Sequence, residues 1–309
     1  MHISIQEAIE LLQAGQVVAL PTETVYGLAA CVSSQPAIAS LFSLKGRPSD
    51  NPLIIHIGQL EQIESLVPSP WMARIAPLAA AHWPGPLTLV VPVKENAVPV
   101  GVRAGLPTAA FRMPAHDSTR AIINATGPLA MPSANRSGSP SSTQPSHVEH
   151  DFGRHFPVVD GGPCPTGLES TILVWEKERW VIGRLGALTP TELAPLLGYL
   201  PVKKRHSERP ICPGQHYRHY APKASLTLTS NAGACQGPVV GFRDRSYPHA
   251  HPLLFFGLSD EPEEAAEQLY AILRQLDELQ LAQAYIDIDF PKEGLWETIL
   301  ERLQKAASR

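Results

Sequence analysis

Short apolar runs alternate with amphipathic segments along roughly the first two thirds of the chain. Residues 17–20 and 52–57 have the length and continuous apolarity of buried strands. Ser4 and Glu7 have the spacing of a capping box, and the apolar helical stripe that follows them stops at Gly15. This alternation predicts an α/β domain built on a twisted open sheet. Further strands are expected at 87–93, near Leu129 and at 170–175, and helices at 36–44, 60–66, 71–82 and 118–125.

A basic, proline-rich segment, residues 201–223, divides the chain. It holds six lysines and arginines against a single glutamate, in a chain whose net charge is −4. This composition is typical of an ordered linker between domains, although a solvated surface loop would show the same charge run. The tail contains strands expected near 226, 238 and 252, a helix over 261–281, a further strand and a last helix from Leu295. We therefore predict a sheet domain at 1–200, a linker at 201–223 and a small Rossmann-like α/β domain at 224–309.

Composition narrows the class of protein further. Of the 309 residues, 44% are hydrophobic and 17% charged, which suits about two packed domains and argues against disorder. No apolar run approaches the roughly 18 residues of a membrane helix, and the first residues do not resemble a signal peptide, so we expect a cytoplasmic protein. The four cysteines are dispersed without CxxC spacing, which argues against a disulfide scaffold or cysteine zinc module. The net negative charge argues against a general polyanion binder, so neither DNA nor a membrane is an expected partner.

Familiar catalytic motifs are absent from the sequence. It contains no P-loop, dinucleotide fingerprint, HExxH or GxSxG pattern. His216 and His219 stand three residues apart, but without a third ligand nearby the pair does not indicate a metal site.

Polar side chains instead gather beyond the expected strands. PTETVYGL, residues 21–28, follows the strand at 17–20, where ligands bind in open α/β sheets; a plain turn is an equal alternative. Lys45 and Arg47 flank a glycine, and two cations so placed can close on a phosphate chain. Arg112 is the residue type that clamps a carboxylate or phosphate, although a surface arginine would fit its spacing as well. We expect these groups to meet in one pocket at the rim of the sheet.

Two later segments add hydroxyl and amide groups. Residues 131–143, MPSANRSGSPSST, could present backbone N–H groups and hydroxyls to an anion, although a flexible linker has similar composition. Residues 160–174 run from a glycine-rich turn to Glu169 and Ser170 at the start of a strand, and Arg184 follows shortly after.

Together, these five segments closely resemble the YrdC-like domain of threonylcarbamoyl-AMP synthases. PTETVYGL, KGRPxxNPL, the Arg112–Pro114–His116 pattern, PSAN-x-SG and ESTI stand in the family's order. PGQHYRHYAP, residues 213–222, is similar to the segment that joins this domain to the smaller one in two-domain members. The resemblance extends over about residues 5–190 and again over 209–222. An aspartate common after ESTI is replaced by Val174–Trp175, a proline by Leu185, and the usual SPT by GSPSST.

The resemblance implies an enzyme that joins L-threonine, bicarbonate and ATP into threonylcarbamoyl-AMP and releases pyrophosphate. The product would reach tRNA indirectly, through downstream transferase proteins. Mg²⁺ on the phosphates is expected, with ligands that the sequence does not identify. Catalytic roles are implied for Lys45 and Arg47; ATP contacts for Arg47, Asn51, Thr108, Asn135, Thr143, Arg184 and Tyr217; and threonine contacts for Thr24, His56, Arg112, Ser133 and Ser170.

Other functions remain open at this point. The linker, with Tyr217, could fold over the nucleotide and exclude water from a labile adenylate. An RNA-binding module would require a basic surface and stacking aromatics, and the sequence shows no such aromatic series. A related domain occurs in hydrogenase-maturation carbamoyltransferases, but those chains carry cysteine-rich zinc repeats that four dispersed cysteines exclude here.

Overall fold

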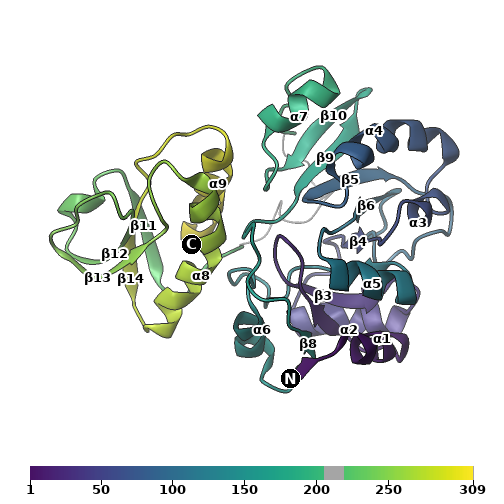
Figure 1. The fold of residues 1–309 in the computed structure, drawn as a ribbon, viewed down its shortest axis with the longest axis horizontal. Helices are drawn as coiled ribbons and strands as arrows, with labels where there is room; N and C mark the ends of the chain where they lie inside the picture. Colours follow the sequence, from purple (N-terminus) through teal and green to yellow (C-terminus); the bar gives the residue numbers. More distant parts are fainter. Residues whose placement is uncertain (205–218, 309) are drawn as a thin grey trace.

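The computed structural model describes residues 1–204 and 219–308. A large domain (purple to teal in Figure 1) is followed by a smaller one (green to yellow), whose helices α8 and α9 lie on the side of its sheet that faces the large domain. The described part of the chain contains no helix with the length and apolarity needed to cross a membrane.

The large domain is built on a ten-stranded mixed sheet with the strand order β1-β8-β2-β3-β7-β4-β6-β5-β9-β10. Pairs β4–β6 and β5–β9 are parallel, whereas β2–β3, β5–β6 and β9–β10 are antiparallel. The strands are β1 His2–Ile3, β2 Val18–Leu20, β3 Gly27–Cys31, β4 Ile54–His56, β5 Leu87–Pro92, β6 Thr108–Arg112, β7 Leu129–Ala130, β8 Val158–Val159, β9 Thr171–Glu176 and β10 Arg179–Arg184.

Both faces of this sheet are buried. On β2, Ala19 packs in the main core, while its neighbours Val18 and Leu20 point to the opposite face and pack in a second core. Alternate side chains of a strand point to opposite faces, so a strand buried on both has a continuous apolar sequence. The helices of the domain are α1 Ile5–Gln13, α2 Gln35–Lys45, α3 Glu61–Glu64, α4 Met72–His82, α5 Asp117–Thr126, α6 Pro145–Phe152 and α7 Pro190–Leu197, with a 3₁₀ turn at Ser69–Trp71.

The smaller domain has a four-stranded, fully parallel sheet with the order β11-β14-β12-β13. Helix α8 buries one apolar side, including Leu269 and Leu273, and packs with α9 around the core of this domain. The elements are β11 Ser225–Thr229, β12 Gly237–Gly241, β13 Ala250–Phe255, α8 Pro262–Glu278, β14 Gln283–Asp287 and α9 Leu295–Ala307, with a 3₁₀ turn at Ala232–Ala234.

The predicted fold class, a twisted open sheet followed by a small Rossmann-like α/β domain, is confirmed. Each strand and helix expected from the sequence has a counterpart, and the Ser4–Glu7 capping box forms at α1. The sequence did not predict β1, β3, β6, β8, β10, α6 or α7. The domain boundaries at 200 and 224 stay a prediction, and most of the predicted linker, residues 205–218, lies outside the described residues.

Candidate functional site

A pocket of about 770 Å³ lies over one face of the large sheet. Ile54 and His56 stand two residues apart on β4 and therefore share this face. Arg112 is registered against His56 on the parallel strand β6, and both residues end their strands. Eight of the predicted site residues line this one pocket: Lys45, Arg47, His56, Arg112, Ser133, Asn135, Ser170 and Arg184.

Lys45 joins the end of α2 to the loop at 131–143. Its buried Nζ donates to the carbonyl oxygens of Ser133 (2.6 Å) and Asn135 (2.8 Å), and to Asn135 Oδ1 (3.2 Å). Burial, together with the nearby Arg47 guanidinium, lowers the pKa of Lys45 well below its usual value. An anionic ligand would offset both effects and favour the charged amine.

Arg47 follows a helix end that requires a glycine. Gly46 has φ +63°, a left-handed conformation that turns the chain out of α2. The Arg47 guanidinium then donates to the carbonyl oxygens of Asn51 (3.1 Å) and Pro52 (2.8 Å), which holds it against the start of β4.

Arg112 lines the same pocket, beside a carboxylate. Its Nη2 donates to Glu23 Oε1 (2.6 Å), and its Nε to the carbonyl oxygen of Gly85 (3.3 Å). Next to it, burial lowers the pKa of His56 to about 3, and the charge of Arg112 contributes. The His56 imidazole is therefore neutral at ordinary pH.

Arg184 and Ser170 also line the pocket. Arg184 Nη2 donates to the carbonyl oxygen of Ser170 (2.9 Å), and the Ser170 hydroxyl shares a hydrogen bond with Thr88 (2.7 Å). Gly186 allows the close approach of β9, because a Cβ there would lie 2.4 Å from the backbone of residues 169–171.

Four other predicted residues lie outside the pocket lining. Thr24 is buried behind it and shares a hydrogen bond with Thr22, which does line it (2.8 Å). Asn51 lines a neighbouring cavity of about 1920 Å³, and its buried Oδ1 has no hydrogen-bond partner among the described residues.

Thr108 and Thr143 line neither cavity. Thr108 begins β6 and so lies at the end of the strand opposite Arg112. Thr143 is buried, with its amide donating to His147 Nδ1 (3.2 Å), whereas the serines at 133, 137, 139 and 141 of the same loop line the pocket. Tyr217 lies outside the described residues.

Glu169 lines the pocket beside Ser170, although it was not among the predicted site residues. Its buried carboxylate accepts hydrogen bonds from Ser141 Oγ (2.8 Å), Tyr270 Oη (2.9 Å) and Arg302 Nε (3.1 Å). Burial by itself would raise its pKa, but the two nearby guanidinium groups, of Arg302 and Arg184, bring it to about 2. The ESTI motif includes Glu169, but its partners Tyr270 and Arg302 lie 101 and 133 residues away in the sequence. No local sequence pattern therefore predicts that its carboxylate is buried and paired.

The end of the linker also reaches the pocket, through His219 and Tyr220. The Tyr220 ring stacks on Tyr270 with centroids 5.2 Å apart, and the fully buried Arg302 guanidinium lies 5.1 Å from its centre. Burial lowers the pKa of His219 to about 3, with further contributions from Arg47 and other cations. This histidine was not among the predicted site residues.

The described residues therefore give the pocket four cationic side chains, those of Lys45, Arg47, Arg112 and Arg184, and one carboxylate, Glu169. Arg302 pairs with that carboxylate and Glu23 pairs with Arg112, both from outside the pocket lining, so the lining keeps a net positive charge. Such a pocket can bring two anionic groups together and orient them.

Comparisons with known proteins agree with this arrangement. Residues 10–186 match the Sua5_yciO_yrdC family model, described as "Telomere recombination", and residues 188–308 match that of the "Threonylcarbamoyl-AMP synthase, C-terminal domain". The threonylcarbamoyl-AMP synthase of Bacillus subtilis is 39% identical, over 98% of this chain and 92% of its own. That of Pyrococcus abyssi is 36% identical, over 98% and 94%. The crystal structure of P. abyssi Sua5 complexed with L-threonine superposes with a TM-score of 0.85 at 34% identity, covering 98% of this chain and 94% of the other.

The fold and the pocket define a class of two-domain α/β enzymes in which a YrdC-like domain carries a cationic ligand site. More particularly, the chain belongs to the threonylcarbamoyl-AMP synthase family.

Proposed function

We propose that the cationic pocket joins L-threonine, bicarbonate and ATP into threonylcarbamoyl-AMP and releases pyrophosphate. The observation that carries this proposal is the meeting of Lys45, Arg47, Arg112 and Arg184 in one buried pocket whose single carboxylate already has its own arginine partner. In the reaction, the threonine amine bonds to the carbon of bicarbonate and water is lost, which gives threonine carbamate. A carbamate oxygen bonds to the α-phosphorus of ATP, and the bond from that phosphorus to the bridging oxygen of pyrophosphate breaks. Two anions must approach each other, so positive charge and orientation supply the catalysis.

Threonine is assigned to the side of the pocket near Arg112. The threonine carboxylate would accept two hydrogen bonds from the Arg112 guanidinium. The neutral imidazole of His56 and the hydroxyls of Ser133 and Ser170 would contact the amine and hydroxyl groups of threonine. The related P. abyssi protein was solved with L-threonine, which supports threonine as a ligand. Thr24 would act through Thr22, with which it shares a hydrogen bond.

ATP is assigned to the cations of the pocket other than Arg112. Lys45, Arg47 and Arg184 would contact its phosphates, and Asn135 would support them from the 131–143 loop. Asn51, with a buried amide oxygen that lacks a partner among the described residues, is suited to a ligand in the neighbouring cavity. Contacts by Thr108, Thr143 and Tyr217 remain predictions from the resemblance, and the positions of Thr108 and Thr143 do not support direct ones.

Mg²⁺ would accompany the triphosphate. No cluster of three or more histidine, cysteine, aspartate or glutamate side chains suited to a metal occurs among the described residues. We therefore expect phosphate oxygens and water to supply its ligands, and the ion to reduce the charge of the triphosphate. We further propose a cytoplasmic enzyme whose product reaches tRNA through downstream transferase proteins.

The test is pyrophosphate release from ATP, with threonine, bicarbonate and Mg²⁺ omitted in turn. We expect pyrophosphate release from ATP to require threonine, bicarbonate and Mg²⁺. Release with carbamoyl phosphate in place of threonine would favour a carbamoyltransferase, and salt-sensitive RNA binding without pyrophosphate release would favour an RNA-binding module.

A further inference from the structure

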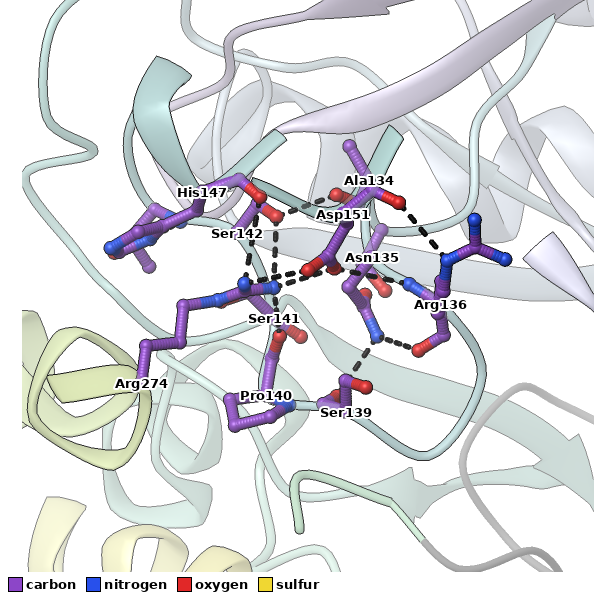
Figure 2. A network of polar contacts seen from close by, with 12 residues as sticks. Ala134, Asn135, Arg136, Ser139, Pro140, Ser141, Ser142, His147, Asp151 and Arg274 are labelled. Atoms are coloured by element: carbon purple, nitrogen blue, oxygen red, sulfur yellow. Dashed lines mark hydrogen bonds and ion pairs between the residues drawn. The ribbon is translucent and has the colours of Figure 1, made fainter. Parts of the chain in front are cut away.

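One buried arginine of the smaller domain, Arg274 on α8, contacts the pocket loop of the large domain. Its guanidinium donates to the carbonyl oxygens of Pro140 (2.6 Å) and Ser141 (3.4 Å) and to Ser142 Oγ (3.2 Å). The side chain is only 7% exposed, and in Figure 2 its charged end lies among residues of the first domain. A buried charge that satisfies backbone carbonyls in this way fixes the backbone that carries them.

The same guanidinium also holds the other end of this loop, through Asp151 at the end of α6. Two parallel hydrogen bonds join them, Nη1 to Oδ1 (2.9 Å) and Nη2 to Oδ2 (2.8 Å). Asp151 Oδ2 in turn accepts the amide of Arg136 (3.2 Å). Arg274 therefore restrains the loop at 136 through Asp151, and at 140–142 directly (Figure 2).

Asn135 carries this restraint to the pocket. Its Nδ2 donates to the carbonyl oxygens of Arg136 (2.7 Å) and Ser139 (2.9 Å), which closes the turn. Its own two oxygens accept hydrogen bonds from Lys45 Nζ (2.8 and 3.2 Å). A continuous polar network thus runs from α8 of the smaller domain to a cation in the pocket.

We propose that Arg274 is a positioning residue for nucleotide binding, through which the smaller domain holds residues 135–142 in the shape that binds ATP. The inference rests on the proposed function for the identity of the nucleotide. Arg112 and His56, on the threonine side, belong to β6 and β4, whereas the hydrogen bonds of Arg274 among the described residues go to residues 140–142, 147 and 151. The restraint should therefore affect ATP far more than threonine.

Arg274→Lys tests this proposal, because lysine keeps the charge but cannot make the forked contacts with Asp151 and Pro140 together. We expect the Kd for ATP, measured by titration calorimetry, to rise about tenfold, as for the loss of one hydrogen bond to a charged group. The Kd for L-threonine should change less than about twofold. Arg245→Lys is the matched control, since Arg245 pairs with Asp287 inside the smaller domain (3.0 Å).

An ATP affinity equal to that of the control would overturn the proposal, as would a parallel loss of ATP and threonine affinity with a lowered melting temperature. If Arg274→Lys does not fold, Asp151→Asn removes the ion pair and leaves the carbonyl contacts; unchanged ATP affinity in that variant also overturns the proposal.

Hydrogen exchange of the amides at 135–142, measured without ligand, separates this proposal from the proposed function. Faster exchange in Arg274→Lys than in Arg245→Lys supports the positioning role even if no pyrophosphate is released, and equal exchange contradicts it.

Discussion

At the scale of single residues, buried charges account for most of the chemistry of the pocket. Arg112 has a carboxylate partner in Glu23, yet it remains part of the pocket lining. Lys45 is fully hydrogen bonded to backbone and amide oxygens, so its position is set before a ligand arrives. Preorganised groups of this kind stabilise developing charge without having to reorient during the reaction.

Arg112→Lys should weaken threonine binding selectively. Lysine cannot make two parallel hydrogen bonds to a carboxylate, so we expect the KM for threonine to rise about 10- to 100-fold. Steady-state kinetics with threonine and ATP varied separately provide the measurement. The KM for ATP should stay within about twofold, and Arg103→Lys, in a loop where that arginine donates to Val98, is the control. Equal increases in both KM values would contradict the assignment of Arg112 to threonine.

Buried histidines make the fold sensitive to acid. Burial, aided by Arg274, lowers the pKa of His147 from 6.5 to about 3, so the unfolded chain binds a proton that the folded one excludes. Above pH 6.5 the histidine is neutral in both states, and the stability of the fold is not reduced by its protonation. As the pH falls from 6.5 towards 3, only the unfolded chain gains the proton, so the free energy of unfolding falls by up to about 1.4 kcal/mol per pH unit.

His147→Gln should therefore reduce the loss of unfolding free energy between pH 7 and pH 5. Urea denaturation at the two pH values measures this difference. His155→Gln, at an exposed position, should behave like the unmodified protein, and an equal pH dependence in all three proteins would count against the role of His147.

At the scale of elements, close backbone approaches determine how the pocket walls meet. Gly186 lies two residues after the end of β10, where the chain passes the start of β9. The neighbouring atoms belong to backbone, so they cannot rotate away from an added methyl group. Gly186 does not have a positive φ, so its backbone conformation does not require glycine. Glycine is required here because there is no space for a Cβ.

Gly186→Ala should destabilise the protein by about 1–3 kcal/mol, because the added methyl overpacks this junction. It should also weaken ATP use, since the shifted backbone carries Ser170, the hydrogen-bond partner of Arg184. Gly101→Ala, where a Cβ meets no atom within 4 Å, should change stability by less than about 0.5 kcal/mol. Urea denaturation distinguishes the two variants, and equal stability would contradict the overpacking argument.

Sequence patterns predicted those elements whose apolar residues are continuous or regularly spaced. Strand β5 and helix α4 are examples, because the burial of each follows from local periodicity. Strand β6 was missed because it begins with a threonine and ends with Arg112, a charge that is buried only through tertiary contacts. Eight of the residues that the motifs singled out line one pocket, whereas Thr143 lies outside its lining.

At the scale of the whole molecule, two buried ion pairs join the domains. Arg302 of α9 pairs with Glu169, and Arg274 of α8 pairs with Asp151. The backbones also approach closely: a Cβ on Gly167 would lie 2.3 Å from the carbonyl oxygen of Ala266 on α8. Neither pair could be foreseen from the sequence, because the partners lie more than 120 residues apart.

Arg302→Met should destabilise the protein by about 3–5 kcal/mol, since it leaves the buried Glu169 without its main counter-charge. Adding Glu169→Gln removes that charge, so the double variant should lose about 1–3 kcal/mol less than the sum of the two single ones. Urea denaturation of the four proteins measures this coupling. The exposed pair Arg243–Glu264 is the control, with expected coupling under about 1 kcal/mol. Additive losses at Arg302 and Glu169 would show that the pair does not act as a unit.

The network that runs from α8 through Asp151 and Asn135 to Lys45 has a thermodynamic counterpart that acts in reverse. Linkage between two equilibria is reciprocal. If domain docking raises the affinity for the nucleotide by some factor, the bound nucleotide raises the equilibrium constant of docking by the same factor. Bound ATP would thus stabilise the docking of the two domains. This stabilisation would be greatest at high ATP concentration and would be lost as ATP is depleted.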